Sequence, residues 1–320
     1  MITIKKLIIS LTLLLTIPAY GTDYLMLTEA GTSARMIALG QIEGFDNSSN
    51  SLFENPASLG SIKNTSISAY STTLINEFEI TNFSISQKTK WGTFAIGQFS
   101  GKISDIPRTG TTGSGGDQQF LELGEFKYTD TLTKIGYQTN FKSRLSYGFT
   151  LNRYTKNIDN VTAKGYDIDA GVKAKWGKTS ISLIAKNILE RDIEYSNNQV
   201  ETLPRQIILG GHYDLGCVGL YGQAKLNGEK GIQKSAGVSA HIPSFPYLKL
   251  LAGYKEYFVL DDLKKGTAIG IALDMGPFAL SYAYEKSDYV EFDSKSYFSM
   301  SLNLNLVGEF KPKPKRRLHR

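Results

Sequence analysis

From residue 63 onward, apolar and polar residues alternate along the chain with a period of two. In YFSMSLNLNL (297–306), every second residue from Phe298 is apolar, and the residues between them are Ser or Asn. Segments 143–156 and 165–176 show the same alternation. A period of two indicates β-strands with one apolar and one polar face. Soluble β-sandwiches alternate in the same way, so this pattern does not choose between a soluble sheet and a membrane barrel.

The alternation predicts about fourteen strands of about ten residues each. They span approximately 63–72, 77–89, 91–101, 124–141, 143–156, 165–176, 178–188, 203–214, 216–227, 231–241, 247–257, 266–274, 276–286 and 295–306. Every second connection is a short turn, as at residues 90, 142 and 177. The connections between these turns are mostly longer and polar, as at 102–123 and 189–202.

An even number of strands, with short turns on one rim and long loops on the other, is typical of outer-membrane barrels. A closed barrel leaves no free edge strand and satisfies every backbone polar group in lipid. Aromatic residues at strand ends fit the two membrane interfaces, and they include Trp91, Phe141, Tyr154 and Trp176. We therefore predict an all-β fold: a transmembrane antiparallel β-barrel of about fourteen strands.

The first 21 residues have the pattern of an export signal. Lys5 and Lys6 precede an apolar run from residue 7 to 17, and small residues follow at Ala19 and Gly21. An exported chain with Cys217 as its single cysteine has no internal disulfide to hold it together. We expect the outer membrane of a bacterial cell as its location and membrane lipid as its surroundings.

The formal charge of +6 is concentrated at the two ends of the chain. Of the 36 Lys and Arg residues, two lie in the predicted signal and six in the tail 311–320, so the body carries 28 against 30 acidic residues. A nearly neutral body removes the main argument for nucleic-acid binding. We expect the basic, proline-containing tail to be disordered in the periplasm, with an electrostatic tether to an anionic partner as the alternative.

No residue pattern indicates catalysis or a cofactor. GVKAKWGKTS (171–180) has five residues between its glycines where a phosphate loop has four, and GTTGSGG (110–116) precedes no helical pattern, which favours a flexible external loop. The three histidines are far apart in the sequence, so no metal site is predicted. No Ser, His and Asp set converges, and we predict a protein that is not an enzyme.

The face of the strands that would line the lumen is strongly polar. Asp167 and Asp169 could attract Ca²⁺, but Lys173 and Lys175 on the same face favour ion pairs instead. Such a lumen weakens the hypothesis of a channel for fatty acids without removing it. The candidate lumen residues are Asp130, Lys134, Arg144, Asp167, Asp169, Lys173 and Lys175.

The segment GTSARMIALGQIEGFDNSSNSLFENPASLG (31–60) resembles the opening of the PorV/PorQ family, relatives of the FadL fatty-acid transporters. Looser matches are GYDIDAGV (165–172), AKNIL (185–189) and LPRQIILGGHY (203–213), while Gln41 and Ser58 depart from the family pattern. The resemblance implies a fourteen-stranded barrel with an N-terminal hatch folded in its lumen. The matching residues are Gly31, Arg35, Gly40, Asn55, Pro56, Ala57 and Leu59.

These observations predict four regions: a signal peptide (1–21), an N-terminal hatch (22–62), an outer-membrane barrel (63–310) and a basic periplasmic tail (311–320). Pro56 fixes its own φ and keeps Asn55 out of the helical region, so we expect any hatch helix to end just before Ala57. The motif would then mark the point where the hatch meets the barrel wall.

The resemblance implies an accessory role in protein export or surface delivery, similar to type IX secretion, with a secretion translocon or exported cargo proteins as partners. The alternative is passive transport of hydrophobic small molecules across the outer membrane, as in the FadL transporters. A purely structural envelope protein is a third possibility. None of the three requires a cofactor.

Overall fold

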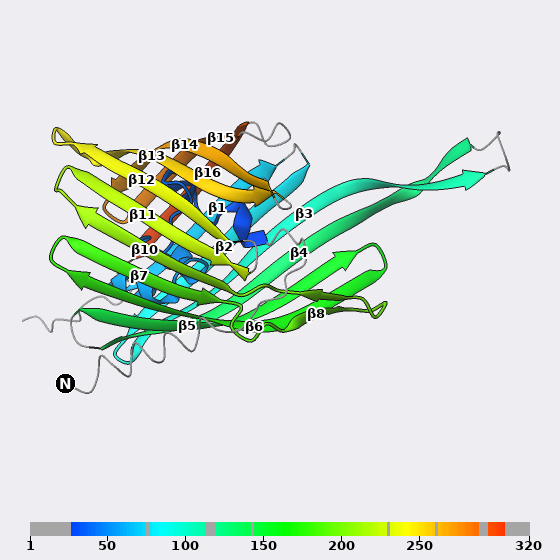
Figure 1. Cartoon of the computed structure of the whole chain (residues 1–320), viewed down its shortest axis with the longest axis horizontal. Coiled ribbons are helices and arrows are strands. Elements are labelled where there is room, and N and C mark those ends of the chain that lie inside the picture. Colours follow the sequence, from blue (N-terminus) through cyan, green and yellow to red (C-terminus); the bar gives the residue numbers. More distant parts are fainter. Residues whose placement is uncertain are drawn as a thin grey trace, which may run out of the picture.

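The strands form a closed antiparallel barrel (Figure 1). The computed structural model describes residues 27–74, 77–112, 119–141, 144–228, 231–259, 262–287 and 294–304. The strands of the barrel are β1 (Thr65–Leu74), β2 (Phe78–Thr89), β3 (Gly92–Thr112), β4 (Gln119–Phe141), β5 (Leu145–Ile158), β6 (Val161–Trp176), β7 (Thr179–Lys186), β10 (Gln206–Asp214), β11 (Val218–Asn227), β12 (Ile232–Ile242), β13 (Phe245–Val259), β14 (Asp262–Met275), β15 (Phe278–Ser287) and β16 (Ser294–Leu304).

Each strand pairs with its neighbours in the chain, and pairing of β1 with β16 closes the ring. The exception is β7, which pairs with β10 instead of with β8. The strands β8 (Asp192–Tyr195) and β9 (Val200–Thr202) form a separate hairpin that pairs with the start of β6. Fourteen strands therefore form the wall in the described part of the chain. The predicted fold class is confirmed.

The two rims of the barrel differ as the sequence predicts. Turns such as 177–178 and 276–277 connect strands at one rim, where β1 begins and β16 ends. The opposite rim carries longer hairpins, which project to the right in Figure 1. Outer-membrane barrels have short turns on the periplasmic side, so we call these the periplasmic rim and the outer rim. The predicted signal peptide and basic tail lie outside the described residues.

Two predictions about the outer rim are wrong. Residues 189–202 are not simply a loop, because they contain the paired strands β8 and β9. Residues 102–123 are not a loop: β3 runs to Thr112 and β4 begins at Gln119, and the two strands stay paired far beyond the barrel (Figure 1). The ladder between β3 and β4 has bulges near residues 103–109, and these accommodate residues that break the alternation. Pro107 is tolerated because β3 no longer pairs with β2 at this point, so the missing N–H costs no ladder hydrogen bond. We call residues 103–112 and 119–127 the outer hairpin. Positions 113–116 of the glycine-rich stretch lie outside the described residues.

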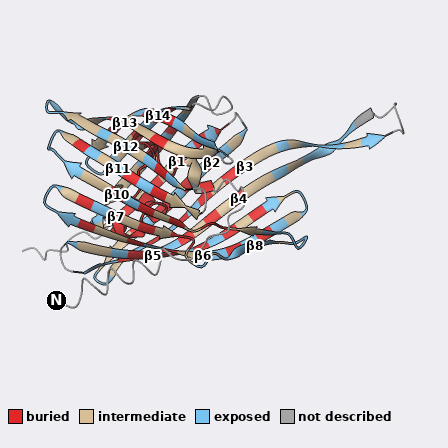
Figure 2. Ribbon diagram, viewed as in Figure 1, coloured by how far each residue is buried: buried red, intermediate tan, exposed pale blue. Residues whose placement is uncertain are grey.

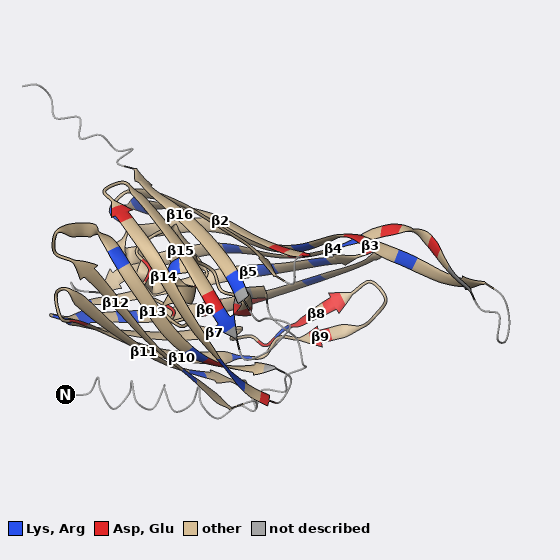
Figure 3. Ribbon diagram, turned by 90° about the horizontal axis from the view of Figure 1, so that it is seen from above, with Lys and Arg blue, Asp and Glu red and all other residues tan. Residues whose placement is uncertain are grey.

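The outer face of the wall is a band of exposed apolar side chains. Residues such as Phe94, Ile96 and Ile135 are exposed, while their neighbours along the strand are buried. Figure 2 shows buried and exposed positions alternating along the strands. Such a band is what a lipid-facing surface requires. Figure 3 shows charged residues along the outer hairpin and at the rims. Tyr154 does not belong to the aromatic band as predicted, because it shares the inward face of β5 with Asn152 and donates to Asn187 Oδ1 at 2.8 Å.

Residues 27–62, which we call the inner segment, lie inside the barrel against its inner face (Figures 1 and 2). Its elements are the 3₁₀ helix η1 (Leu27–Ala30), the helix α2 (Ala34–Ala38) and the 3₁₀ helices η2 (Ser49–Leu52) and η3 (Pro56–Ser61). Side chains cap three of them: Ser33, Ser48 and Asn55 accept hydrogen bonds from backbone N–H groups. None of the described helices has the length and apolar character needed to cross a membrane.

Glycines on the inward face of the wall allow the inner segment to approach the strands closely. A Cβ on Gly148 would collide with the backbone of Pro56 and Ala57, and one on Gly253 would collide with the backbone of Gly40. Further glycines in similar contact are Gly97, Gly136, Gly171, Gly237 and Gly270. The wall is therefore shaped to fit the inner segment on several sides.

Candidate functional site

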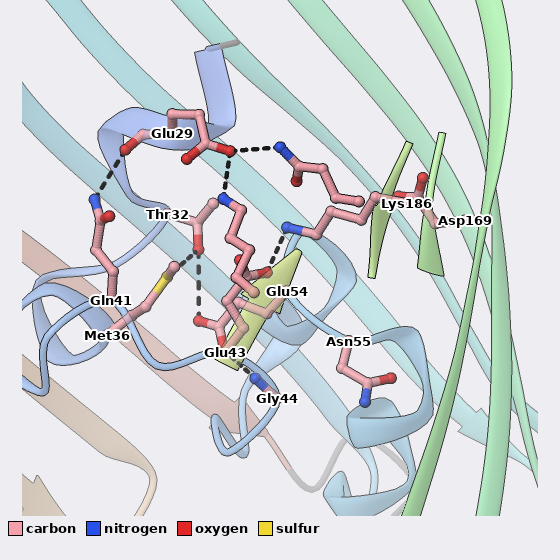
Figure 4. Close-up of polar contacts among 12 residues, drawn as sticks. Glu29, Thr32, Met36, Gln41, Glu43, Gly44, Glu54, Asn55, Asp169 and Lys186 are labelled. Atoms are coloured by element: carbon pink, nitrogen blue, oxygen red, sulfur yellow. Dashed lines mark hydrogen bonds and ion pairs between the residues drawn. The ribbon is translucent and has the colours of Figure 1, made fainter. Parts of the chain in front are cut away.

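The lumen is the candidate site, and charged groups fix the inner segment within it. Glu29 pairs with Lys225 of β11, and Glu43 pairs with Lys186 of β7 (Figure 4). Arg35 reaches Asp274 of β14 at 3.8 Å. Burial alone would raise the pKa of Glu29, but the ammonium of Lys225 outweighs it and holds this pKa below its usual value.

Asn55 connects the inner segment to the wall on the side of β5–β7. Its Oδ1 accepts a hydrogen bond from Ala57 N at 2.9 Å, and its Nδ2 donates to Ser182 Oγ at 2.8 Å. Pro56 therefore begins η3 rather than ending a helix, and that prediction is wrong. The physical reason is that proline fits the first position of a helix, where its missing N–H costs nothing, and asparagine fits the cap before it.

The other residues of the predicted motif also lie in the inner segment. Leu59 is fully buried and packs with Leu52. Gly31 and Gly40 have φ of 87° and 78°, a region that glycine adopts without strain. Gly40 also faces the backbone of Tyr254 in β13.

The structure places the predicted lumen residues at different depths. Asp130, Lys134, Asp167 and Asp169 are buried and face inward, Lys173 is half-buried, and Lys175 and Arg144 are exposed at the periplasmic rim. Asp130 is 3.8 Å from Lys156 of β5. Among the described residues, no group of three His, Cys, Asp or Glu side chains could hold a metal ion.

The predicted ion pairs between aspartates and lysines of the same strand do not form. Asp169 pairs with Lys134 of β4, and Asp167 accepts hydrogen bonds from the N–H groups of Ile168, Leu189 and Arg191. Lys173 donates to Ser58 Oγ at 3.2 Å. The long Lys134 side chain reaches Asp169 across β5, and backbone N–H groups satisfy Asp167, so neither aspartate pairs with a lysine of its own strand.

An apolar cluster that the sequence analysis missed lies in the lumen toward the outer rim. Tyr70 and Phe99 have ring centroids 6.4 Å apart, and Phe99 packs on Phe53 of the inner segment at 5.8 Å. Residues of the inner segment, among them Leu27, Ile37 and Phe53, belong to the same buried core. We call the following members of this core, which lie outside the inner segment, the lumen cluster: Tyr70, Leu74, Ile80, Phe99, Leu132, Tyr154, Ile193, Leu203 and Tyr297. The apolar residues Leu74 and Ile80 at inward positions are the sequence signal that predicts such a cluster.

The inward face changes character along single strands. On β1, Ser66 and Ser68 lie toward the periplasmic rim, and Tyr70 and Leu74 follow on the same face toward the outer rim. On β7, Ser180 and Ser182 are buried in the periplasmic half. On these strands, the inward face carries hydroxyl groups toward the periplasmic rim. On the side of β1–β5, it carries apolar side chains toward the outer rim.

Comparison with known proteins identifies the fold. No protein-family model matches the chain, and no curated protein sequence does. The crystal structure of the toluene transporter TodX of Pseudomonas putida matches with a TM-score of 0.61 at 13% identity, covering 86% of this chain and 98% of that one. A FadL homologue of Pseudomonas aeruginosa matches with a TM-score of 0.54 at 9% identity, covering 85% and 98%. The chain has the fold of an outer-membrane β-barrel.

The likeness to these barrels concerns the fold, because identities of 9–13% are low. A TodX monoaromatic hydrocarbon channel variant gives a similar result, with a TM-score of 0.56 at 12% identity over 85% of this chain. These neighbours are transporters and channels rather than enzymes. The resemblance of the inner segment to PorV/PorQ stays a prediction from the sequence.

Proposed function

We propose that the protein is a passive channel through which small hydrophobic molecules cross the outer membrane. The fold it shares with a toluene transporter and a FadL homologue supports this proposal. A solute that moves down its own concentration gradient through the barrel needs no energy source. Transport of hydrophobic small molecules is therefore preferred to a role in protein export.

The observation that carries the proposal is the lumen cluster. Its side chains are only 0–6% exposed and pack against one another, so a hydrophobic solute would enter this apolar region by displacing part of the packing. The cluster lies toward the outer rim and packs directly against the inner segment, whose Leu27, Ile37 and Phe53 belong to the same buried core. A solute that arrives from outside would reach the cluster where the wall and the inner segment pack together.

In this proposal the inner segment acts as a hatch. It is held by ion pairs to three wall strands and by close contacts with inward glycines, so it fills the lumen below the cluster. We propose that it stays in the barrel during transport, because its departure would leave buried charges such as Lys186 without their partners.

Uptake of labelled toluene and labelled oleate by cells that express the barrel tests this function. Ile80 is buried on the inward face of β2, and Ile96 is half exposed on the outward face of β3. We expect Ile80→Thr to raise the half-saturating concentration roughly tenfold, because a polar group enters the apolar site. Ile96→Thr, the same change on the lipid face, serves as the matched control. Influx no higher than in cells without the barrel, for both solutes, would reject the proposal.

The outer hairpin favours a second candidate function, the accessory role in protein export that the PorV resemblance implies. In the described part of the chain, β3 has no ladder with β2 after Lys102, and β4 has none with β5 before Tyr128. Free strand edges that project from a rim can pair with another chain, such as exported cargo or a translocon subunit.

Replacement of residues 104–126 by a short Gly-Ser turn separates the two candidates. If the protein serves in export, cross-linking in whole cells captures cargo or translocon proteins on the wild type and loses them on the shortened variant. If it is a channel for small molecules, the shortened variant transports the labelled solutes and no export partner is captured on either protein. Loss of captured cargo together with unchanged solute influx would favour the export role.

A further inference from the structure

The periplasmic half of the wall carries cations without carboxylates along the arc from β1 to β7. The stretches of these strands and turns on that side, 61–70, 87–101, 131–151 and 170–186, contain no Asp or Glu. The outer end of the same arc carries both signs, as at Asp105, Arg108 and Glu125. The excess of positive charge is therefore confined to the side that faces the periplasm.

Three of these cations lie together where β5 begins and β6 ends. Arg144 lies beside Lys175, because the N–H of Lys175 donates to the carbonyl oxygen of Arg144 at 2.9 Å. Lys173 is two residues from Lys175 on β6 and therefore on the same face. Its Nζ donates to Ser58 Oγ of the inner segment at 3.2 Å. We call Arg144, Lys173 and Lys175 the mouth patch.

The mouth patch faces the lumen rather than the bilayer. Gly148 and Gly171 continue its face along β5 and β6, and a Cβ on either would collide with residues 55–57 of the inner segment. Arg144 and Lys175 are exposed at the rim, beyond these contacts. The patch therefore opens to the periplasm beside η3 and is turned away from lipid.

The charges of the mouth patch are not balanced within the described residues, where none of its three members forms an ion pair. Three carboxyl groups of the same region have backbone partners of their own: Asp46, Asp214 and Glu54 accept the N–H groups of residues 48, 216 and 44. Like charges on adjacent positions of neighbouring strands repel each other. A bound anion would remove this repulsion, so the patch is suited to an anionic ligand.

The spacing of the patch matches an extended acidic chain. Lys173 and Lys175 are roughly 6.6 Å apart along β6, which is twice the rise per residue of a strand. Alternate side chains of an extended peptide have the same spacing, so carboxylates two residues apart can each meet one ammonium group. Beside Lys175, the guanidinium of Arg144 can hold a carboxylate through two parallel hydrogen bonds.

We propose that the mouth patch binds an extended acidic segment of a periplasmic polypeptide, with Asp or Glu at alternate positions. A segment of this kind satisfies all three cations at once. The interaction would connect the barrel to a soluble component of the periplasm. It does not depend on which solute crosses the barrel, because the patch lies at the opposite end of the lumen from the lumen cluster.

A labelled peptide of alternating Asp and Gly residues tests this proposal. Its affinity for the purified full-length protein in neutral detergent is measured by fluorescence anisotropy. Arg144→Gln with Lys175→Gln removes two cations of the patch. We expect the affinity of this variant to fall roughly tenfold, which corresponds to the loss of two exposed ion pairs near the upper end of their usual strength.

Lys63→Gln with Lys90→Gln is the matched control, because it removes the same charge from two exposed positions elsewhere on the rim. Lys90 lies over the ring of Trp91, with its Nζ 4.8 Å from the ring centroid, and not on the mouth patch. The control should lose less than twofold in affinity, and the basic tail 311–320 is the same in every variant. Heat-dependent mobility on gels confirms that each variant is folded. Equal losses in the two double variants would overturn the proposal, since only the total charge would then matter.

Acetate distinguishes an acidic segment from simple anions. At the same concentration of carboxylate groups as the peptide, acetate should displace less than a tenth of it, because a single carboxylate cannot bridge the three cations. Displacement in proportion to the concentration of carboxylate would show that the patch takes simple anions only, and the proposal would fail.

Anionic lipid is the competing occupant. Native mass spectrometry counts the phosphatidylglycerol molecules that the protein retains from a mixed detergent solution. Arg144→Gln with Lys175→Gln should retain as many as the wild type, because these cations face the mouth of the lumen. Loss of bound lipid from this variant, with its affinity for the peptide unchanged, would assign the patch to the membrane surface and reject the acidic segment.

Discussion

The side chain of Asn55 bridges two parts of the chain that are far apart in sequence: it caps η3 through Ala57 N and donates to Ser182 Oγ of β7 at 2.8 Å. Beneath it, Gly171 of β6 leaves room for the amide. The motif Asn-Pro-Ala thus fastens the inner segment to the wall just before β1 begins. Both the local helix and the tertiary contact depend on one side chain.

Asn55→Ala should therefore lower the stability of the inner segment by about 1–2 kcal/mol, because a cap and a buried hydrogen bond are lost together. Limited proteolysis of the purified barrel, followed by identification of cuts within residues 27–62, measures this effect. Asn47→Ala, at an exposed position of the same segment, is the control. Equal cutting of the two variants would show that Asn55 does not hold the segment.

Much of the barrel is predictable from sequence because each strand carries its own signal. The alternation in β16 or β6 identifies a strand and its two faces without reference to any other part of the chain. Short turns such as 177–178 then make consecutive strands neighbours. The outer hairpin was not predicted because Pro107 and Gly124 interrupt the alternation. Bulges accommodate these interruptions, but a bulge can be recognised only when the partner strand is known.

The partners of lumen residues are harder to predict, because they depend on the stagger between strands. Asp169 is recognisably an inward residue of β6, but its partner Lys134 lies two strands away on β4. Similarly, Ser182 as a partner of Asn55 depends on how the inner segment sits in the closed ring. Sequence spacing gives the face of a residue, and only the assembled ring gives its neighbours.

Close packing at inward glycines predicts a sharp difference between two valine substitutions. A side chain at Gly253 would collide with the backbone around Gly40, whereas one at Gly222 of β11 meets nothing within 4 Å. We expect Gly253→Val to cost about 3 kcal/mol or more, because neither backbone can move aside easily. Gly222→Val should be tolerated. The fraction of folded barrel, read from the mobility shift on gels before and after heating, compares the two variants, and equal yields would contradict the tight fit.

Glu54 makes the inner segment sensitive to pH. Burial, together with the nearby charges of Asp46 and Glu43, raises the pKa of Glu54 from 4.5 to about 8. Its carboxyl oxygens accept hydrogen bonds from Gly44 N at 3.1 Å and Asn50 Nδ2 at 3.3 Å, and no cation forms an ion pair with it in the described residues (Figure 4). The folded protein therefore favours the neutral acid.

The sign of the pH effect follows from this raised pKa. In an unfolded inner segment Glu54 ionises above pH 4.5, whereas the folded form keeps its proton up to about pH 8. The stabilising contribution is therefore complete at low pH and is lost as the pH rises across that window, by a few kcal/mol in order of magnitude. Protease cutting within residues 27–62 should increase from pH 5 to 8.

Glu54→Gln removes the titrating group while keeping a neutral side chain of the same shape. The nearby ionisable groups Glu43, Asp46, Lys173 and Lys186 remain in this variant. We expect its cutting rate, corrected for the activity of the protease at each pH, to be nearly constant over the same range. If the variant and the wild type show the same dependence on pH, another group is responsible.

The buried pair of Glu43 and Lys186 allows two quantities to be compared. One is the stability that the whole ion pair contributes, and the other is the stability lost when only one partner is removed. Glu43→Gln leaves the Lys186 ammonium buried and uncompensated, and such losses cost about 3–5 kcal/mol. Changing both residues, Glu43→Gln with Lys186→Met, removes the stranded charge and should recover much of the stability. The temperature at which the barrel loses its compact mobility on gels provides the measurement. A double variant as unstable as Glu43→Gln alone would mean that the Glu43 carboxylate acts through a contact other than Lys186. The backbone N–H of residue 43, which donates to Gln223 Oε1 at 2.8 Å, is the same in all variants and cannot cause the difference.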